Sequence, residues 1–171
     1  SSRVLNDATF TNTGGNLFLS GSALFQNTVN FTQTAGNTDI GNGSFVNANS
    51  FNNFGTYNHD GGTTNIHGGA TLLNDSFYNH DGGTLTVHAS GLFKNDFVNT
   101  ISGGTVQINA GGTLNGTGFA STTLTGGTLR VNGEMIQTGV TINGGTLDGT
   151  GTVRSNIANN GGTVGPGNSP G

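Results

Sequence analysis

The chain has 171 residues, of which 33 are glycine and two are proline, and its formal net charge is −4. The four Lys and Arg residues are scattered, so there is no basic stripe to neutralise phosphates, and nucleic acid is not an expected partner. Apolar runs are short, far below the length of a membrane span, and the absence of cysteine excludes disulfides and thiolate chemistry.

Two nearly identical segments, at residues 57–63 and 78–84, reveal an internal repeat. Both read Tyr-Asn-His-Asp-Gly-Gly-Thr, and the second begins 21 residues after the first. A fixed offset of this size is typical of a solenoid. The Gly-Gly pair, with Ala35-Gly36 in one place, divides the chain into about eight rungs of roughly 21 residues. The glycines of these pairs are Gly14, Gly15, Gly61, Gly62, Gly82, Gly83, Gly103, Gly104, Gly126, Gly127, Gly144, Gly145, Gly161 and Gly162.

The regularity of the repeat changes along the chain. Residues 1–27 form an ordinary first rung, and residues 28–54 are the least regular part, with extra residues that predict a bulge or small loop near 47–56. Residues 55–118 are the most regular. From Phe119 onward aliphatic residues replace aromatic ones, and the rungs shorten over 140–171, where the last two steps are 18 and 17 residues.

Apolar residues recur at fixed distances from the glycine pairs. Alternate positions after each pair are apolar, which is the period-2 pattern of a strand with one buried face. We expect the following residues to form the core columns: Phe10, Phe31, Tyr57 and Tyr78 before the pairs, and Leu19, Ile40, Ile66, Val87, Ile108 and Val131 after them.

Each rung contains about three short strands, separated by glycines that can adopt the positive φ of a sharp corner. The second strand of the rung carries pairs such as Leu24-Phe25 and Leu92-Phe93, and a third piece comes with Phe51 or Phe54, Phe77 and Phe97. Helical periodicity is absent. The sequence therefore predicts an all-β chain that forms a single right-handed parallel β-helix, or β-solenoid, over 1–171.

The C-terminal part resembles a known type of repeat. Residues 144–153 read Gly-Gly-Thr-Leu-Asp-Gly-Thr-Gly-Thr-Val, and residues 161–171 read Gly-Gly-Thr-Val-Gly-Pro-Gly-Asn-Ser-Pro-Gly. This pattern is similar to the strand repeats of bacterial autotransporter passengers and related secreted haemagglutinin-like β-helices, and the resemblance covers about residues 100–171. It implies an extracellular or cell-surface bacterial rod. Passengers of this shape include adhesins, enzymes and inert stalks, so the class of function stays open.

Stacked histidines and aspartates are the candidate metal ligands. His59 and His80 share one column and Asp60 and Asp81 the next, at a spacing that would let two imidazoles hold a metal. Alternation places both histidines on the inward face, which favours hydrogen-bonded stacking instead. The aspartates then point outward beside the glycine corner, where Asp often accepts bonds from local backbone N–H groups. No metal or cofactor is expected. His67 and His88 form a further stacked pair.

Catalytic patterns are weak. Polysaccharide-active β-helices use clustered carboxylates with a general acid or a cation. Glu134 is the only glutamate here, no three aspartates fall in adjacent columns, and the two stacked aspartates have no nearby Lys or Arg in the pattern. We expect no enzymatic activity and keep a polysaccharide-active enzyme as a remote alternative.

Two polar columns are interpreted as structural. A threonine column could order water on a flat face, but the neighbouring column does not match it, so β-branched residues that favour a strand are the simpler reading. Recurrent asparagines predict an amide ladder along the stack. The threonines are Thr63, Thr84, Thr105, Thr128, Thr146 and Thr163, and the asparagines are Asn27, Asn47, Asn74, Asn95 and Asn115.

These observations predict a structural β-solenoid rod outside the cell, a building block of a surface stalk or filament with an adhesive or scaffolding role. Each end of a β-helix leaves unpaired backbone groups, so the expected partner is the chain itself, stacked end to end, unless these residues are part of a longer rod. The alternative is an adhesin that binds glycan or a host surface. An adhesin should show an exposed aromatic patch, and an enzyme should show a groove lined by carboxylates.

Overall fold

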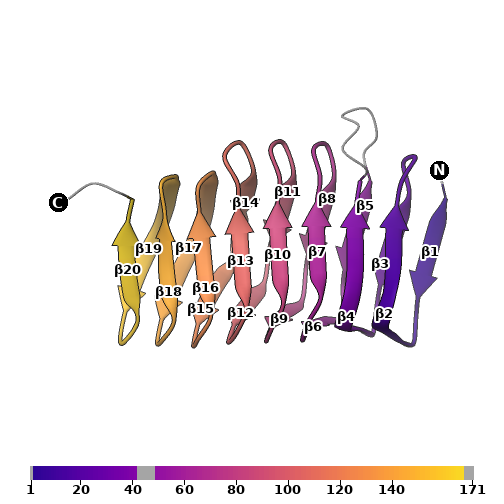
Figure 1. The fold of residues 1–171 in the computed structure, drawn as a ribbon, viewed down its shortest axis with the longest axis horizontal. Coiled ribbons are helices and arrows are strands. Elements are labelled where there is room, and N and C mark those ends of the chain that lie inside the picture. The colour runs from indigo at the N-terminus through magenta and orange to yellow at the C-terminus, as the bar shows by residue number, and fades with distance from the viewer. Residues whose placement is uncertain (1, 42–48, 168–171) are drawn as a thin grey trace.

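The computed structural model describes residues 2–41 and 49–167. This part of the chain contains no helix and forms one parallel sheet of 20 strands, wound into a β-solenoid of about seven turns. In Figure 1 the chain rises along the front strands, passes behind and returns one rung closer to the C-terminus, so the coil is right-handed. The predicted fold class is confirmed.

The rod has three faces. We call A the face whose strands come just before each glycine pair, B the face whose strands come just after it, and C the face that follows B and leads to the next rung. Face A contains the first part of β2 (Thr9–Leu19) and β4 (Asn30–Ile40), then β6 (Thr56–His59), β9 (Phe77–His80), β12 (Val98–Ile101), β15 (Ser121–Leu124) and the second part of β17 (Glu134–Ile142) and β19 (Thr152–Asn159). Face B contains the second part of β2 and β4, then β7 (Thr63–Ile66), β10 (Thr84–Val87), β13 (Thr105–Ile108), β16 (Thr128–Val131), β18 (Thr146–Gly149) and β20 (Thr163–Pro166). Face C contains β1 (Arg3–Asn6), β3 (Leu24–Asn27), β5 (Ser50–Asn53), β8 (Thr71–Asn74), β11 (Leu92–Asn95), β14 (Thr113–Asn115) and the first part of β17 and β19.

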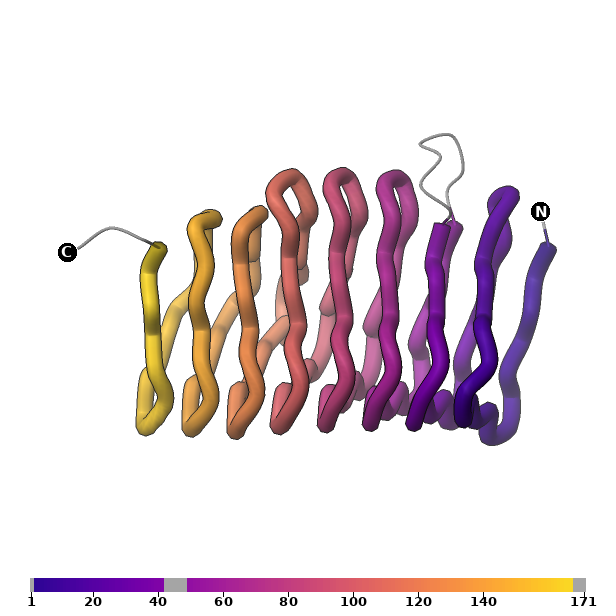
Figure 2. Tube along the Cα trace, viewed as in Figure 1, coloured from indigo at the N-terminus to yellow at the C-terminus, as the bar shows by residue number. Residues whose placement is uncertain are grey.

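Each strand pairs with its equivalent in the neighbouring rung. Tyr57 pairs with Phe31 on one side and Tyr78 on the other, and Ile66 pairs in the same way with Ile40 and Val87. Along β6, β8 and β12 every second residue is buried, because successive side chains of a strand point to opposite faces. The buried residues fill one continuous column from Leu19 to Leu147. The rungs lie side by side along the rod, with β1 and β20 at opposite ends (Figure 2).

The glycine pairs form the corner between faces A and B, and the two positions of a pair require glycine for different physical reasons. Gly83 has a φ of +71°, a conformation that a residue with a side chain seldom adopts. Gly82 has no such φ, but a Cβ there would lie 2.4 Å from the backbone oxygen of Asp60 in the preceding rung. The first glycine therefore permits rungs to approach closely, and the second turns the chain.

Three local predictions need correction or completion. The extra residues predicted near 47–56 lie earlier in the chain, because β5 and β6 are regular strands. Nine residues separate β4 from β5, whereas four separate β7 from β8. Phe51 joins the buried column of Phe25, and Phe54 is exposed. Asn53 is the residue that pairs with Asn74 in the asparagine column. Asn47 lies outside the described residues, and Asn115 pairs with Lys94, whose side chain points outward.

Candidate functional site

A buried polar cluster lies beneath the A–B corner in the rungs of β4, β6–β7 and β9–β10. The Gln33 Oε1 atom accepts hydrogen bonds from Thr38 Oγ1 at 2.8 Å, from the Tyr57 hydroxyl at 3.0 Å and from Thr64 Oγ1 at 3.1 Å. Its Nε2 atom donates to the backbone oxygen of Thr63 at 2.7 Å. All four side chains are fully buried. The cluster satisfies polar groups that would otherwise be costly inside the rod.

His59 and His80 continue this cluster as a stacked pair and point inward, with no exposed surface. Their Nδ1 atoms lie 2.9 Å apart, and the Tyr78 hydroxyl lies 3.1 Å from the His59 Nδ1 atom. One of the two neutral imidazoles must therefore carry its proton on Nδ1 and donate a hydrogen bond to the Nδ1 atom of the other. Both Nε2 atoms are buried and make no hydrogen bond of ordinary geometry, although backbone groups of the glycine corner lie close to both rings.

Burial decides the charge of the pair. Desolvation, with the repulsion from His80 added, lowers the pKa of His59 to about 3, and desolvation lowers that of His80 to about 4. Burial also raises the pKa of Tyr57 and Tyr78 well above the ordinary range. All four side chains are therefore neutral at pH 7, and none is a base or a nucleophile in contact with solvent.

Asp60 and Asp81 lie at the same corner on the outer side. Desolvation and the neighbouring Asp81 raise the pKa of Asp60 above its usual value. Asp81 accepts a hydrogen bond from the Ser102 hydroxyl in the next rung. The backbone separates these carboxylates from the inward imidazoles, so the four predicted metal candidates do not form one site. Among the residues that the structure describes, no three His, Asp or Glu side chains are arranged to hold a metal ion.

The outward histidines form a separate surface cluster on face B. The rings of His67 and His88 are parallel, with centroids 4.8 Å apart. Asp39 Oδ1 lies 3.4 Å from His67 Nε2 and accepts from Asn65 Nδ2 at 2.9 Å, while Asn65 Oδ1 lies 3.2 Å from His88 Nε2. Desolvation and His67 lower the pKa of His88. These contacts occupy the Nε2 atoms of both imidazoles.

Ion pairs occupy other carboxylates of the described surface. Asp148 forms a two-point contact with Arg130, at 2.9 and 2.7 Å. This guanidinium lowers the pKa of Asp148. Lys94 pairs with Asp96 at the start of the corner between faces C and A. Paired carboxylates of this kind belong to structural networks, and they are not arranged as an acid and a base across a groove.

A row of exposed apolar residues follows the C–A corner and was not predicted. We call Val29, Phe54, Phe77, Phe97 and Phe119 the corner ridge, with one member on each of five successive rungs. Phe54 is 42%, Phe77 47% and Phe119 83% exposed, and Phe97 is half-buried. The rings of Phe77 and Phe97 meet edge to face, with centroids 5.3 Å apart. An exposed aromatic patch is therefore present, although the sequence had suggested inward aromatic columns.

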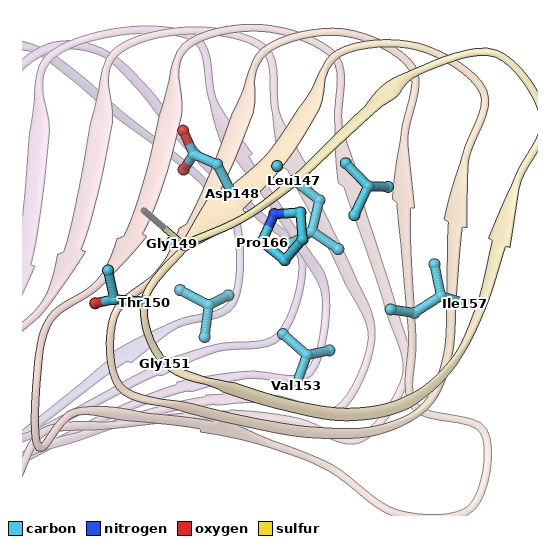
Figure 3. A pocket seen from close by; sticks show the side chains of 12 residues that line it. Leu147, Asp148, Gly149, Thr150, Gly151, Val153, Ile157 and Pro166 are labelled. Carbon is cyan, nitrogen blue, oxygen red and sulfur yellow. The ribbon is translucent and has the colours of Figure 1, made fainter. Parts of the chain in front are cut away.

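An open cavity of about 350 Å³ lies at the end of the rod that holds β20. Figure 3 shows the side chains of Leu147, Val153, Ile157 and Pro166 directed into this space. Ile157 and Val164 each leave about two fifths of their surface exposed. The cavity is the mouth of the solenoid at this end of the described rod, and the inward columns line it.

Comparison with protein-family models, with curated proteins and with solved structures found no match to this chain. None of the described segments is a helix long and apolar enough to cross a membrane.

Proposed function

We propose that this chain is a structural rod, a building block of an extracellular stalk or filament that grows by stacking β-solenoid rungs end to end. One observation carries the proposal: the apolar core continues to the end of the described rod and opens there as an apolar mouth. Its lining is mostly aliphatic, with Val153, Ile157 and Val164 at the rim. Apolar surface of this kind is stabilised when another layer covers it.

The opposite end offers a matching layer. Val4 and Phe10 begin the same columns that Val153 and Ile157 end, and Val4 is 50% and Phe10 36% exposed. Stacking one copy on another would place Phe10 over Ile157 and Val4 over Val153, and would pair the free backbone groups of the terminal strands. Such a head-to-tail contact repeats without closing, so it produces a filament.

The alternatives have less support. The carboxylates of Asp148 and Asp96 are paired with cations, and the buried histidines have no path to solvent. An adhesive role fits the exposed corner ridge better than an enzymatic one does. The resemblance to autotransporter passengers and haemagglutinin-like repeats agrees with a rod at the cell surface.

Sedimentation of the purified chain and of two matched variants tests the stacking. Ile157→Asp places a carboxylate on the rim, and Ile136→Asp makes the same change at a side chain that is 38% exposed on face C, away from the mouth. Both should fold, because both positions are partly exposed. We expect Ile157→Asp to remove the long species and Ile136→Asp to retain them. Equal behaviour of the two variants would contradict end-to-end stacking.

A further inference from the structure

Exposed apolar side chains are not spread evenly over the rod. Between the first and last rungs, the large apolar residues with the most exposed surface in the described chain are Val29, Phe54, Phe77, Phe119 and Ile136. Only Ile136 lies outside the corner ridge. Exposed apolar side chains that gather along one corner mark an interaction site in soluble proteins.

The chemistry of the ridge favours a dry protein contact. Its members are phenylalanine and valine, which have no hydroxyl or N–H group to share with a polar ligand. The edge-to-face contact of Phe77 with Phe97 prevents these rings from forming one flat platform. The ridge also follows an outer corner, whereas small-molecule sites are concave.

The two flanks of the ridge differ in charge. On the face C side, Asp75 is exposed and Asp96 pairs with Lys94, so two carboxylates and one ammonium group leave this flank weakly acidic. On the face A side, the outward residues of the same rungs are the uncharged Asn79 and Thr100. An antiparallel pair of rods would bring the two acidic flanks together. A parallel pair would place each acidic flank against the uncharged flank of the other copy, which avoids like-charge repulsion.

We propose that two copies of this chain pair side by side, in parallel, along the corner ridge. A two-fold axis along the rods makes the contact isologous, so each ridge residue meets its own equivalent. The rungs of both copies have the same spacing of about 4.8 Å, which keeps five successive contacts in register. This lateral pairing uses a surface distinct from the ends and does not depend on end-to-end stacking.

The exposed area is sufficient for a moderate dimer. At about 200 Å² for each phenylalanine side chain, the exposed parts of Phe54, Phe77 and Phe119 provide about 350 Å² per copy. Two ridges with their flanks then approach the roughly 1,000 Å² that a specific interface needs. We therefore expect a concentration-dependent pair.

Sedimentation equilibrium in the Ile157→Asp background measures lateral pairing apart from end stacking. The double variant Phe77→Ser and Phe119→Ser should weaken self-association at least about tenfold, because two exposed rings leave the interface. The matched control is Phe18→Ser, since Phe18 is 61% exposed on face B of the first rung. A chain that stays monomeric at high concentration, or a double variant that associates like the control, would overturn the proposal.

Engineered cysteines determine the orientation, since the chain has none of its own. Val29→Cys and Phe119→Cys place a thiol near opposite ends of the ridge. In a parallel pair each variant oxidises to a disulfide-linked dimer by itself, because equivalent residues lie within the roughly 7 Å between Cα atoms that a disulfide permits. Cross-linking that occurs only when the two variants are mixed would show an antiparallel pair and would overturn the parallel arrangement.

Discussion

Two parts of the rod share one backbone repeat but have different interiors. In the rungs of β4–β10 the buried column beneath the glycine corner contains Gln33, His59 and His80, whereas from β12 to β17 the same column contains Ile101, Leu124 and Ile142. We call these the polar and the aliphatic segments. The comparison shows that glycine corners and period-2 alternation determine the winding, while the interior can be hydrogen-bonded or apolar.

The two interiors differ in what they require. In the aliphatic segment the column gains stability from the burial of apolar surface alone. In the polar segment each buried group needs a hydrogen-bond partner, and the Nε2 atoms of His59 and His80 make no hydrogen bond of ordinary geometry. Buried polar atoms without a hydrogen bond also occur in the aliphatic segment, at Asn99 Oδ1 and Gln137 Nε2, so unpaired groups do not distinguish the two segments. The buried imidazoles do distinguish them, because they can take up protons in acid.

The largest expected effect tests whether both segments share one core. Val87→Asp in the polar segment and Ile108→Asp in the aliphatic segment should each cost several kcal/mol and cause cooperative unfolding, because an unpaired carboxylate would be buried. Thr86→Asp is the control, since its side chain points outward. Thermal melts measure the difference. A Val87→Asp variant that melts like the wild type would show that this column faces solvent.

The next effect is a loss of stability in acid, which is expected to come from the polar segment. The folded-state pKa values of about 3 for His59 and about 4 for His80 lie below the ordinary 6.5, so the unfolded chain takes up these protons first. The free energy of unfolding should then fall from about pH 6.5 toward pH 4, by up to about 1.4 kcal/mol per pH unit for each imidazole. Above pH 6.5 the pair should contribute no pH dependence.

Substitution of His59 and His80 measures how much the two imidazoles contribute to this loss of stability in acid. His59→Ile with His80→Leu copies the residues of the aliphatic segment and should flatten the stability curve between pH 6.5 and 4. Replacing the outward His67 and His88 by Gln should retain most of the slope. Denaturant titrations at several pH values measure both. An unchanged slope in the Ile/Leu variant would show that the buried imidazoles do not control acid sensitivity.

A smaller effect is expected in the asparagine ladder of face C. Asn53 donates to Asn74 at 2.7 Å, and Asn74 donates to Asn95 at 2.7 Å. Asn74→Ala should cost about 2–3 kcal/mol, because it leaves buried amide groups unpaired. Asn79→Ala removes an outward amide that bonds Asn58 at 2.9 Å and should cost less than about 1 kcal/mol. Similar losses for both variants would contradict a structural role of the buried ladder.

The smallest expected effect is that of metal removal. The inward imidazoles have no third convergent ligand among the described residues. Dialysis against EDTA should therefore leave the melting temperature unchanged in both segments. A fall of many degrees that zinc or calcium reverses would mean that a metal contributes to folding.

The sequence predicted the winding well because glycine pairs and apolar alternation are local signals. Tyr57, Ile66 and Val87 lie in the register that counting from the glycines predicts. The corner ridge was missed because its members do not share one offset from the next glycine pair. Phe77 stands five residues before it, Phe97 six, and Phe54 and Phe119 seven. Only the folded corner gathers these staggered positions.

Register errors in the amide ladder have a similar cause. The count from neighbouring hydrophobic residues chose Asn47 and Asn115, but Phe51 is the residue that pairs with Phe25, and it brings Asn53 into the column. The contact between the imidazoles of His59 and His80 depends on side-chain rotamers, which the spacing of residues does not determine.

Electron microscopy of the purified chain tests the central claim most directly. One copy is a rod of about 35 Å, from about seven turns spaced by about 4.8 Å. End-to-end stacking predicts particles whose lengths are multiples of this value and increase with concentration. Compact particles of one protomer length at high concentration would contradict a filament-forming rod.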